Sequence, residues 1–206
     1  MKITRTGNAG VLIETKGIKI LIDGVCEHLP PYEETPMSFR EEMIQTPPDV
    51  LLFTHNHKDH YDSEFARIYK EKTLRPVYGA GCPPEIKTGD VEIIAIPTRH
   101  IGKTDIPHCS FIVKGDRCVW FAGDASPIEW KGKDAFPKPD AFVVPYAYTI
   151  TESGWKIAKS SGAEKIVLLH LPQRELDEYK LWDTTEAVTN GDLSLLIPQV
   201  GETLVV

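Results

Sequence analysis

Residues 53–62 read FTHNHKDHYD and place three of the chain's seven histidines within six positions. The apolar run DVLLFTH (49–55) leads into them and predicts a strand buried on both faces. His55 and His57 are two apart, so their side chains point the same way in an extended chain. Asp59 and His60 follow, just before SEFARIYKEK (63–72), whose apolar spacing predicts a helix. The alternative, a solvated loop that caps this helix, does not explain why four metal-ligand side chains gather here.

Three further strand ends carry residues of the same kind. AIPTRH ends at His100, VWFAGD ends at Asp124, and IVLLHLP contains His170. Taken alone, each histidine reads as a satisfied core residue and Asp124 as a turn residue after Gly123. Together with the 55–60 cluster, polar donors at the ends of apolar strands favour one shared metal site, because burying such groups without partners is costly.

Composition limits the classes of function. The chain has 206 residues, a formal net charge of -7 and no basic stripe, which argues against a nucleic-acid substrate. No apolar run approaches the length of a membrane span, and we expect a cytoplasmic protein. The four cysteines form no C-x-x-C pair, which argues against a zinc ribbon and favours packing roles.

The element pattern predicts an α+β fold. We expect strands at 2–7, 10–15, 16–24, 91–98, 110–115, 117–124, 140–146, 164–170 and within 193–206, with a hairpin turn at Lys16-Gly17. Helices are expected at 63–72, 151–163 and 174–188. Residues 26–48 hold five prolines and predict a loop insertion with a short helix near 38–44, capped by Ser38 with Glu41. We predict one domain over 1–206, an αββα sandwich of two mixed sheets flanked by helices.

These motifs resemble the metallo-β-lactamase-fold metal-dependent hydrolases. H-x-H-x-D-H at 55–60 matches their signature, and GNAGVLIETKGIKILIDG (7–24) resembles their opening, closest to the L-ascorbate-6-phosphate lactonase-like and uncharacterised hydrolase branch. That branch often has a histidine where this chain has Asn8, and a GHTPGS-like run after His100 is missing. The resemblance implies a first metal on His55, His57 and His100, a second on Asp59, His60 and His170, and Asp124 as a bridge.

The resemblance implies a dinuclear hydrolase in which a metal-bridging hydroxide, oriented by Asp59, attacks a small ester, lactone or phosphoester. Zinc is the first choice of divalent metal, with manganese or iron as alternatives. A phosphodiesterase or nuclease-like hydrolase, an iron-dependent oxidoreductase and a non-catalytic binding protein are the competing interpretations. We expect a small-molecule substrate and no membrane partner. Both a monomer and a homo-oligomer are compatible with the sequence.

Several residues near the motifs have two interpretations each. His108 is either a general acid for the leaving group or a surface histidine. His28 either reaches the site or is exposed, and Tyr146 and Tyr148 either line the pocket or pack. Arg99, Lys58 and Lys103 either hold a phosphate or carboxylate or are simply exposed. The 26–48 loop either covers the site or meets a neighbouring subunit.

Overall fold

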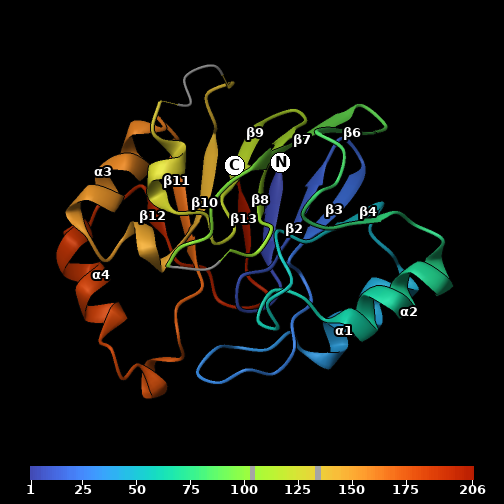
Figure 1. The fold of residues 1–206 in the computed structure, drawn as a ribbon, viewed down its shortest axis with the longest axis horizontal. Coiled ribbons are helices and arrows are strands. Elements are labelled where there is room, and N and C mark those ends of the chain that lie inside the picture. Colours follow the sequence, from blue (N-terminus) through green and yellow to red (C-terminus); the bar gives the residue numbers. More distant parts are fainter. Residues whose placement is uncertain (103–104, 133–135) are drawn as a thin grey trace.

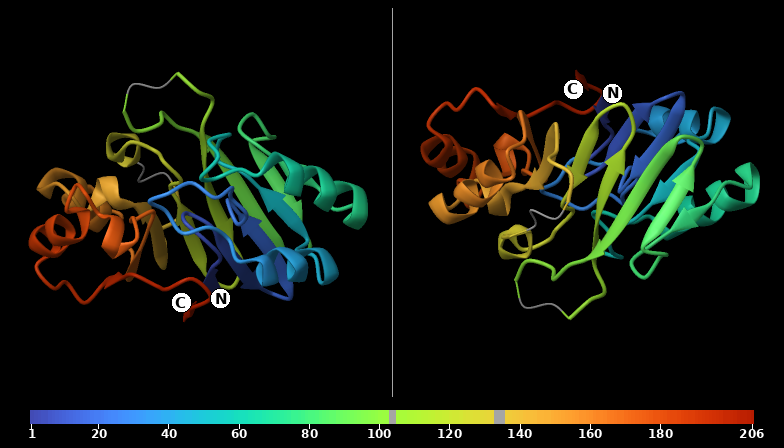
Figure 2. Two further views of the ribbon diagram at one scale, coloured as in Figure 1. Left: turned by 90° about the horizontal axis from the view of Figure 1, so that it is seen from below. Right: turned by 90° about the horizontal axis from the view of Figure 1, so that it is seen from above.

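The computed structural model describes residues 1–102, 105–132 and 136–206. A six-stranded sheet and a seven-stranded sheet pack face to face, and helices cover both outer sides (Figure 1, Figure 2). The predicted α+β sandwich of two mixed sheets is therefore confirmed. No helix in the described ranges is long and apolar enough to cross a membrane.

The first sheet has the order β13-β1-β2-β3-β4-β5 and the second has the order β12-β11-β10-β9-β8-β7-β6. The strands of the first sheet are β1 (Lys2–Arg5), β2 (Val11–Thr15), β3 (Ile18–Ile22), β4 (Val50–Leu52), β5 (Val77–Tyr78) and β13 (Thr203–Val205). Those of the second are β6 (Glu85–Thr88), β7 (Val91–Pro97), β8 (Cys109–Lys114), β9 (Cys118–Phe121), β10 (Ala141–Pro145), β11 (Lys165–Leu169) and β12 (Leu195–Leu196).

The helices lie on opposite outer faces (Figure 1). They are α1 (Met37–Gln45) and α2 (Ser63–Thr73) on the first sheet, and α3 (Glu152–Ser160) and α4 (Leu181–Thr189) on the second. Short 3₁₀ turns cover Pro127–Trp130, Tyr146–Tyr148 and Arg174–Leu176.

Strand alternation explains the layers. In β3, Ile20 and Ile22 point into the cluster between the sheets, whereas Leu21 points to the cluster under α1 and α2. In β9, Phe121 points between the sheets and Trp120 points toward the other helices. Successive side chains leave a strand on opposite faces, so strands that are apolar at every position need a layer on each side. Each fully buried side chain of this kind stabilises the fold by about 1.5–3 kcal/mol.

Parallel strands bring the site together. β3, β4 and β5 are parallel neighbours in the first sheet, as are β9, β10, β11 and β12 in the second. The residues that follow β3, β4, β9 and β11 therefore meet at one end of the sandwich, where ligands bind in open sheets of this kind.

Two local predictions were wrong, and two short strands were missed. Helix α1 begins at Met37 after Pro36 and has no side-chain cap, so Ser38 lies inside the helix. The predicted helix 174–188 is broken, because the Asp177 carboxylate accepts the backbone N–H groups of Leu181 and Trp182 and α4 starts only there. Strands β5 and β6 were not predicted, since runs of two and four residues offer too few positions for a pattern to be recognised.

Candidate metal centre

The seven metal ligands predicted from the sequence converge at one end of the sandwich. Three groups of side chains have their ligand atoms within 4.8 Å of one another: His55 with His57 and His100, His55 with His60 and Asp124, and Asp59 with His60 and His170. All are buried except His57, which is partly exposed. The three groups share His55 and His60, so the structure joins all seven side chains into one cluster.

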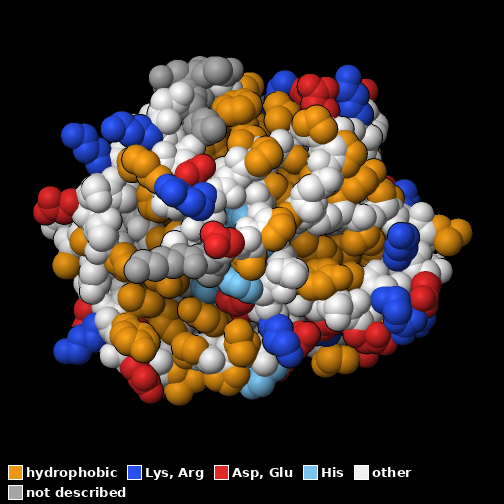
Figure 3. Space-filling model, viewed as in Figure 1, with side chains coloured by type: hydrophobic (Ala, Val, Ile, Leu, Met, Phe, Trp, Pro, Cys, Tyr) orange, Lys and Arg blue, Asp and Glu red, His pale blue; other side chains and the backbone are white. Residues whose placement is uncertain are grey.

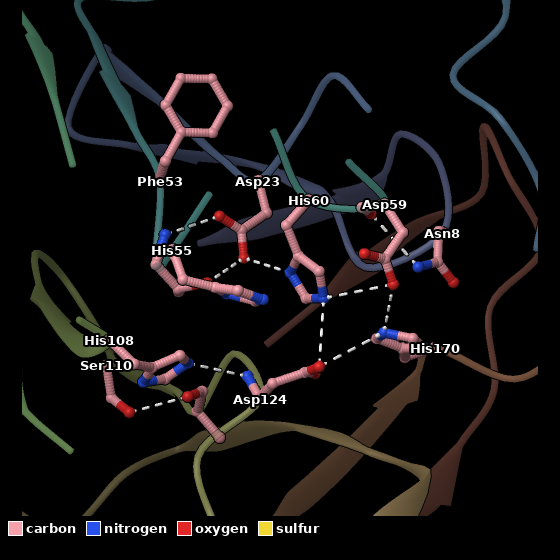
Figure 4. A network of polar contacts seen from close by, with 12 residues as sticks. Asn8, Asp23, Phe53, His55, Asp59, His60, His108, Ser110, Asp124 and His170 are labelled. Atoms are coloured by element: carbon pink, nitrogen blue, oxygen red, sulfur yellow. Dashed lines mark hydrogen bonds and ion pairs between the residues drawn. The ribbon is translucent and has the colours of Figure 1, made fainter. Parts of the chain in front are cut away.

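The Asp124 carboxylate points toward His60 and His170 (Figure 4). Its Oδ2 is 3.4 Å from His60 Nε2, 3.4 Å from His100 Nε2 and 3.5 Å from His170 Nε2. The preceding Gly123 has φ +55°, and a Cβ there would lie 2.5 Å from Thr54 Cγ2. Only glycine fits this left-handed, close approach, which carries the chain from β9 to Asp124.

Hydrogen bonds fix the orientation of three histidines. The Nδ1 of His60 contacts Asp23 Oδ2 at 2.9 Å, that of His100 contacts the Ile101 carbonyl at 2.6 Å, and that of His55 contacts Thr54 Oγ1 at 2.9 Å. A carboxylate or carbonyl only accepts, so Nδ1 of His60 and of His100 carries the proton. In each ring Nε2 is left to face the centre of the cluster.

The buried atoms in the centre fit a cation. The Nε2 atoms of His55, His60 and His100, and Oδ1 of Asp124, make no hydrogen bond with any described residue. Unpaired buried polar atoms are costly, and imidazole nitrogens and carboxylate oxygens together are the ligands of zinc and related metals. The donor set and its lack of partners therefore suit divalent cations.

Asp23 is a functional residue that the sequence analysis missed. It follows β3 with φ 48°, and it is buried. Besides His60, its carboxylate accepts the Thr54 backbone N–H at 2.8 Å and the Thr54 hydroxyl at 2.7 Å. The signal was present in ILIDG (20–24), an aspartate at the end of an apolar strand like Asp124. Such carboxylates behind a histidine orient the ring and fix its tautomer.

Burial and neighbouring charges shift the pKa values of the clustered side chains in opposite directions. Burial disfavours the charged form of His60, yet Asp124 and Asp23 raise its pKa well above the ordinary value. Burial and the neighbouring His60 lower the pKa of His55. Burial would raise the pKa of Asp124, but His170 and His60 hold it well below its usual range. The Asp124 carboxylate therefore carries negative charge at neutral pH, which favours a cation beside it.

His108 is buried, so its expected place on the surface was wrong. Its Nε2 accepts the Asp124 backbone N–H at 3.0 Å (Figure 4). Its Nδ1 is 2.8 Å from Thr98 Oγ1. Thr98 Oγ1 is in turn hydrogen-bonded to the Ser110 hydroxyl, which donates to the Ala122 backbone carbonyl. Burial lowers the pKa of His108 to about 3. Both nitrogens are engaged, which supports a role in positioning Asp124, and the general-acid role stays a prediction.

The 26–48 loop lies over the His170 side of the cluster. The Tyr32 ring meets the His170 ring edge-on at 4.5 Å, and Tyr146 lies 5.7 Å from the same ring. The Pro31 carbonyl accepts the Gln173 backbone N–H, and Glu27 N–H bonds the Lys58 carbonyl. Of the two interpretations of this loop, these contacts support coverage of the site. Tyr32 was not anticipated, because nothing in its local sequence points to His170.

The remaining predicted residues take the following positions. Asn8 is fully buried, and its side-chain amide donates to the Asp59 backbone carbonyl at 3.2 Å, while its backbone carbonyl accepts from the His170 backbone N–H. Tyr148 packs against Phe142 in the core, as the packing interpretation predicts. His28 is exposed and pairs with Glu34. Arg99 and Lys58 are exposed and pair with Glu129 and Glu27, and Lys103 lies outside the described residues.

The sequence was compared with families and curated proteins of known description. Residues 2–169 match the model of the beta-lactamase superfamily domain. A UPF0173 metal-dependent hydrolase of Methanoregula boonei is 26% identical over 99% of this chain and 97% of its own length.

Solved structures share the fold. An isothiocyanate hydrolase from Delia radicum gut bacteria superposes with a TM-score of 0.68 at 18% identity, covering 100% of this chain and 99% of the other. The metallo-beta-lactamase fold protein YhfI from Bacillus subtilis gives 0.68 at 15% identity, covering 98% of each chain. At these identities the likeness establishes the fold alone.

Proposed function

Because the chain belongs to the beta-lactamase superfamily, we propose that it is a hydrolase whose site holds two divalent cations. The first cation would be held by His55, His57 and His100, the second by Asp59, His60 and His170, with Asp124 between them. The observation that carries this proposal is the convergence of these seven side chains in three groups of mutually close ligand atoms. The relative from Methanoregula boonei, named a metal-dependent hydrolase, supports it.

Zinc is the cation we propose first, with manganese or iron as alternatives, because imidazole and carboxylate ligands accept all three. Two such cations would supply Lewis-acid chemistry, which makes water acidic enough to react at neutral pH and polarises the bond to be broken. We keep a small ester, lactone or phosphoester as the substrate class, with a phosphodiester as the alternative. Membership of the lactonase-like branch stays a prediction.

Asp59 is the residue we propose for orienting the attacking water. Its Oδ2 lies 3.1 Å from His170 Nε2. Burial would raise its pKa, but the hydrogen bond from His170 and the nearby His60 lower it. Asp59 therefore stays an ionised hydrogen-bond acceptor at neutral pH, which suits a group that accepts a hydrogen bond from water and so orients it.

Tyr146 is the residue we propose for contacting a substrate oxygen. It follows β10 and lies beside His170. Burial and the neighbouring carboxylates Asp124 and Asp59 raise the pKa of its phenol. It therefore remains a hydrogen-bond donor at neutral pH and can stabilise negative charge that develops on a substrate oxygen.

The test is hydrolysis by zinc-loaded and manganese-loaded protein of an activated phosphodiester and of a simple lactone, with metal counted in the same samples. Chelation of the metals should abolish turnover. Asp124→Ala and His57→Ala should lower both metal content and turnover, whereas the exposed His28→Ala serves as the matched control. Full metal content and full activity in Asp124→Ala would contradict its assignment, and a single iron per chain would contradict the two-cation hydrolase.

A further inference from the structure

A pocket of about 400 Å³ opens beside His55. It lies where the parallel strands β4 and β5 end, so residues following both strands line it: Phe53, His55 and Asn56 after β4, and Gly79 and Ala80 after β5. The Phe53 backbone N–H bonds the Tyr78 carbonyl at 2.9 Å, which holds the two strand ends together. His55 belongs to two of the three ligand groups, so the pocket adjoins a residue of the proposed metal centre.

Aromatic side chains form the wall of this pocket. Phe53 and Tyr61 meet edge-on, with ring centroids 4.6 Å apart and planes at 86°. Tyr78 and Val77 of β5 line it as well. Phe53 is buried, and its place in the core under α2 fixes the wall from behind. In the space-filling view, hydrophobic side chains gather beside the histidines near the middle of this face (Figure 3).

The lining has no partner for a charged group. Among the described residues that line the pocket, none is lysine, arginine, aspartate or glutamate, and the polar side chains besides the Tyr61 and Tyr78 phenols are His55 and Asn56. A charged substituent would lose its hydration there with no oppositely charged side chain to compensate, whereas an apolar substituent gains free energy from burial. The volume is in the range of pockets that hold small organic groups.

A second pocket, of about 330 Å³, lies on the other side of the site beside Tyr32. It includes the acidic residues Asp177 and Glu178 and none of the seven predicted metal ligands. The first pocket, by contrast, shares His55 with the proposed metal centre. The two pockets therefore differ in the charge of their lining and in whether a predicted metal ligand belongs to it.

We propose that the pocket beside His55 binds an uncharged aromatic or short alkyl group of the substrate, next to the bond that is hydrolysed. This inference rests on the proposed function, since the metals define where the reacting bond lies. It narrows the substrate class to compounds with an apolar side and argues against phosphorylated sugar acids, whose polar groups would face Phe53, Tyr61 and Val77.

The experiment measures how hydroxamates, which chelate divalent metals, bind to the zinc-loaded protein by calorimetry. Acetohydroxamate, benzohydroxamate and succinohydroxamate place a methyl, a phenyl and a carboxylate-bearing tail beside the same chelating group. We expect benzohydroxamate to bind about 10- to 100-fold more tightly than acetohydroxamate, as burial of a phenyl ring implies. Succinohydroxamate should bind no more tightly than acetohydroxamate. Zinc content is measured before and after each titration to exclude stripping.

Two variants locate the effect. A Cβ added at Gly79 would meet no atom within 4 Å, so Gly79→Phe fills the pocket without a backbone clash, and the ratio of the two affinities should fall to about 1. Tyr179→Ala, an exposed residue of the second pocket, should preserve the ratio.

Each result separates this inference from the proposed function. A ratio near 1 in the unmodified protein, an unchanged ratio in Gly79→Phe, or tightest binding of succinohydroxamate overturns the pocket assignment and leaves the metal centre standing. A ratio that depends on Tyr179 moves the apolar group to the second pocket and also overturns it. If two zinc ions are bound and no hydroxamate binds, the metals are not open to substrate, and the proposed function fails together with the inference.

Discussion

Asp23→Asn should weaken metal binding without touching a proposed ligand. The Asp23 carboxylate accepts three hydrogen bonds, from His60 Nδ1, the Thr54 hydroxyl and the Thr54 backbone N–H. Asparagine has nearly the same shape and can still accept the backbone N–H through its oxygen. Its NH₂ group would then face the Thr54 hydroxyl and His60 Nδ1, which now donate to Oδ2. Two hydrogen-bond donors would point at each other, and neither hydrogen bond could form as before.

The consequence falls on the tautomer of His60. To accept from the new amide, the ring must release its Nδ1 proton and carry it on Nε2, the atom that faces the proposed second cation. Loss of a hydrogen bond to a charged group costs about 1.5–3 kcal/mol. Residues in this supporting position typically change metal affinity by about 10- to 100-fold. We therefore expect the second cation to bind about 10- to 100-fold more weakly, while the first is less affected.

The assay is a zinc titration of metal-free protein against a competing chelator, with circular dichroism to verify folding. Asp49→Asn is the matched control. Asp49 lies just before β4 begins, at the end of the strand away from the metal centre, where its carboxylate accepts the Lys19 backbone N–H and pairs with Arg75. In His60→Ala, adding Asp23→Asn should cause little further loss, since both act through one ring. Wild-type affinity at both sites in Asp23→Asn, or an equal loss in Asp49→Asn, would refute this reasoning.

Two further predictions concern residues outside the proposed ligand set. His108→Ala leaves the buried Asp124 amide without an acceptor, so urea unfolding should show a loss of about 1–3 kcal/mol, and His108→Gln should recover part of it; wild-type stability in the alanine variant would contradict the positioning role. At Asp192, Lys159 and Ser194 lower the pKa to about 2, below the about 3.9 of an unfolded aspartate. Asp192 therefore stabilises the fold above about pH 4, and this contribution is lost as the pH falls toward 2. Asp192→Asn should lower the free energy of unfolding at pH 7 by less than about 1 kcal/mol, because the pair is partly exposed, and the difference from wild type should vanish only as the pH falls below the folded pKa of about 2.

Local patterns in the sequence were sufficient for the layers of the fold and for the proposed ligands. In Ile20, Leu21 and Ile22 every position is apolar, and a strand of this kind must be covered on both faces wherever it lies. The 55–60 loop and the polar residues that end strands at 100, 124 and 170 are visible without knowing their partners. Chemical identity and spacing are properties of the chain itself, so the α+β sandwich and the set of converging donors could be predicted.

The supporting residues were decided only by the tertiary structure. Asp23 contacts His60, His108 contacts the Asp124 backbone, and Tyr32 contacts His170. No local sequence pattern indicates these pairs. The pocket beside His55 likewise exists only because β5, too short to be predicted, pairs in parallel with β4. Such roles depend on which strand ends become neighbours and on which ring nitrogen meets which acceptor. Those contacts form between distant parts of the chain when the two sheets pack, and the packing of the whole core determines them.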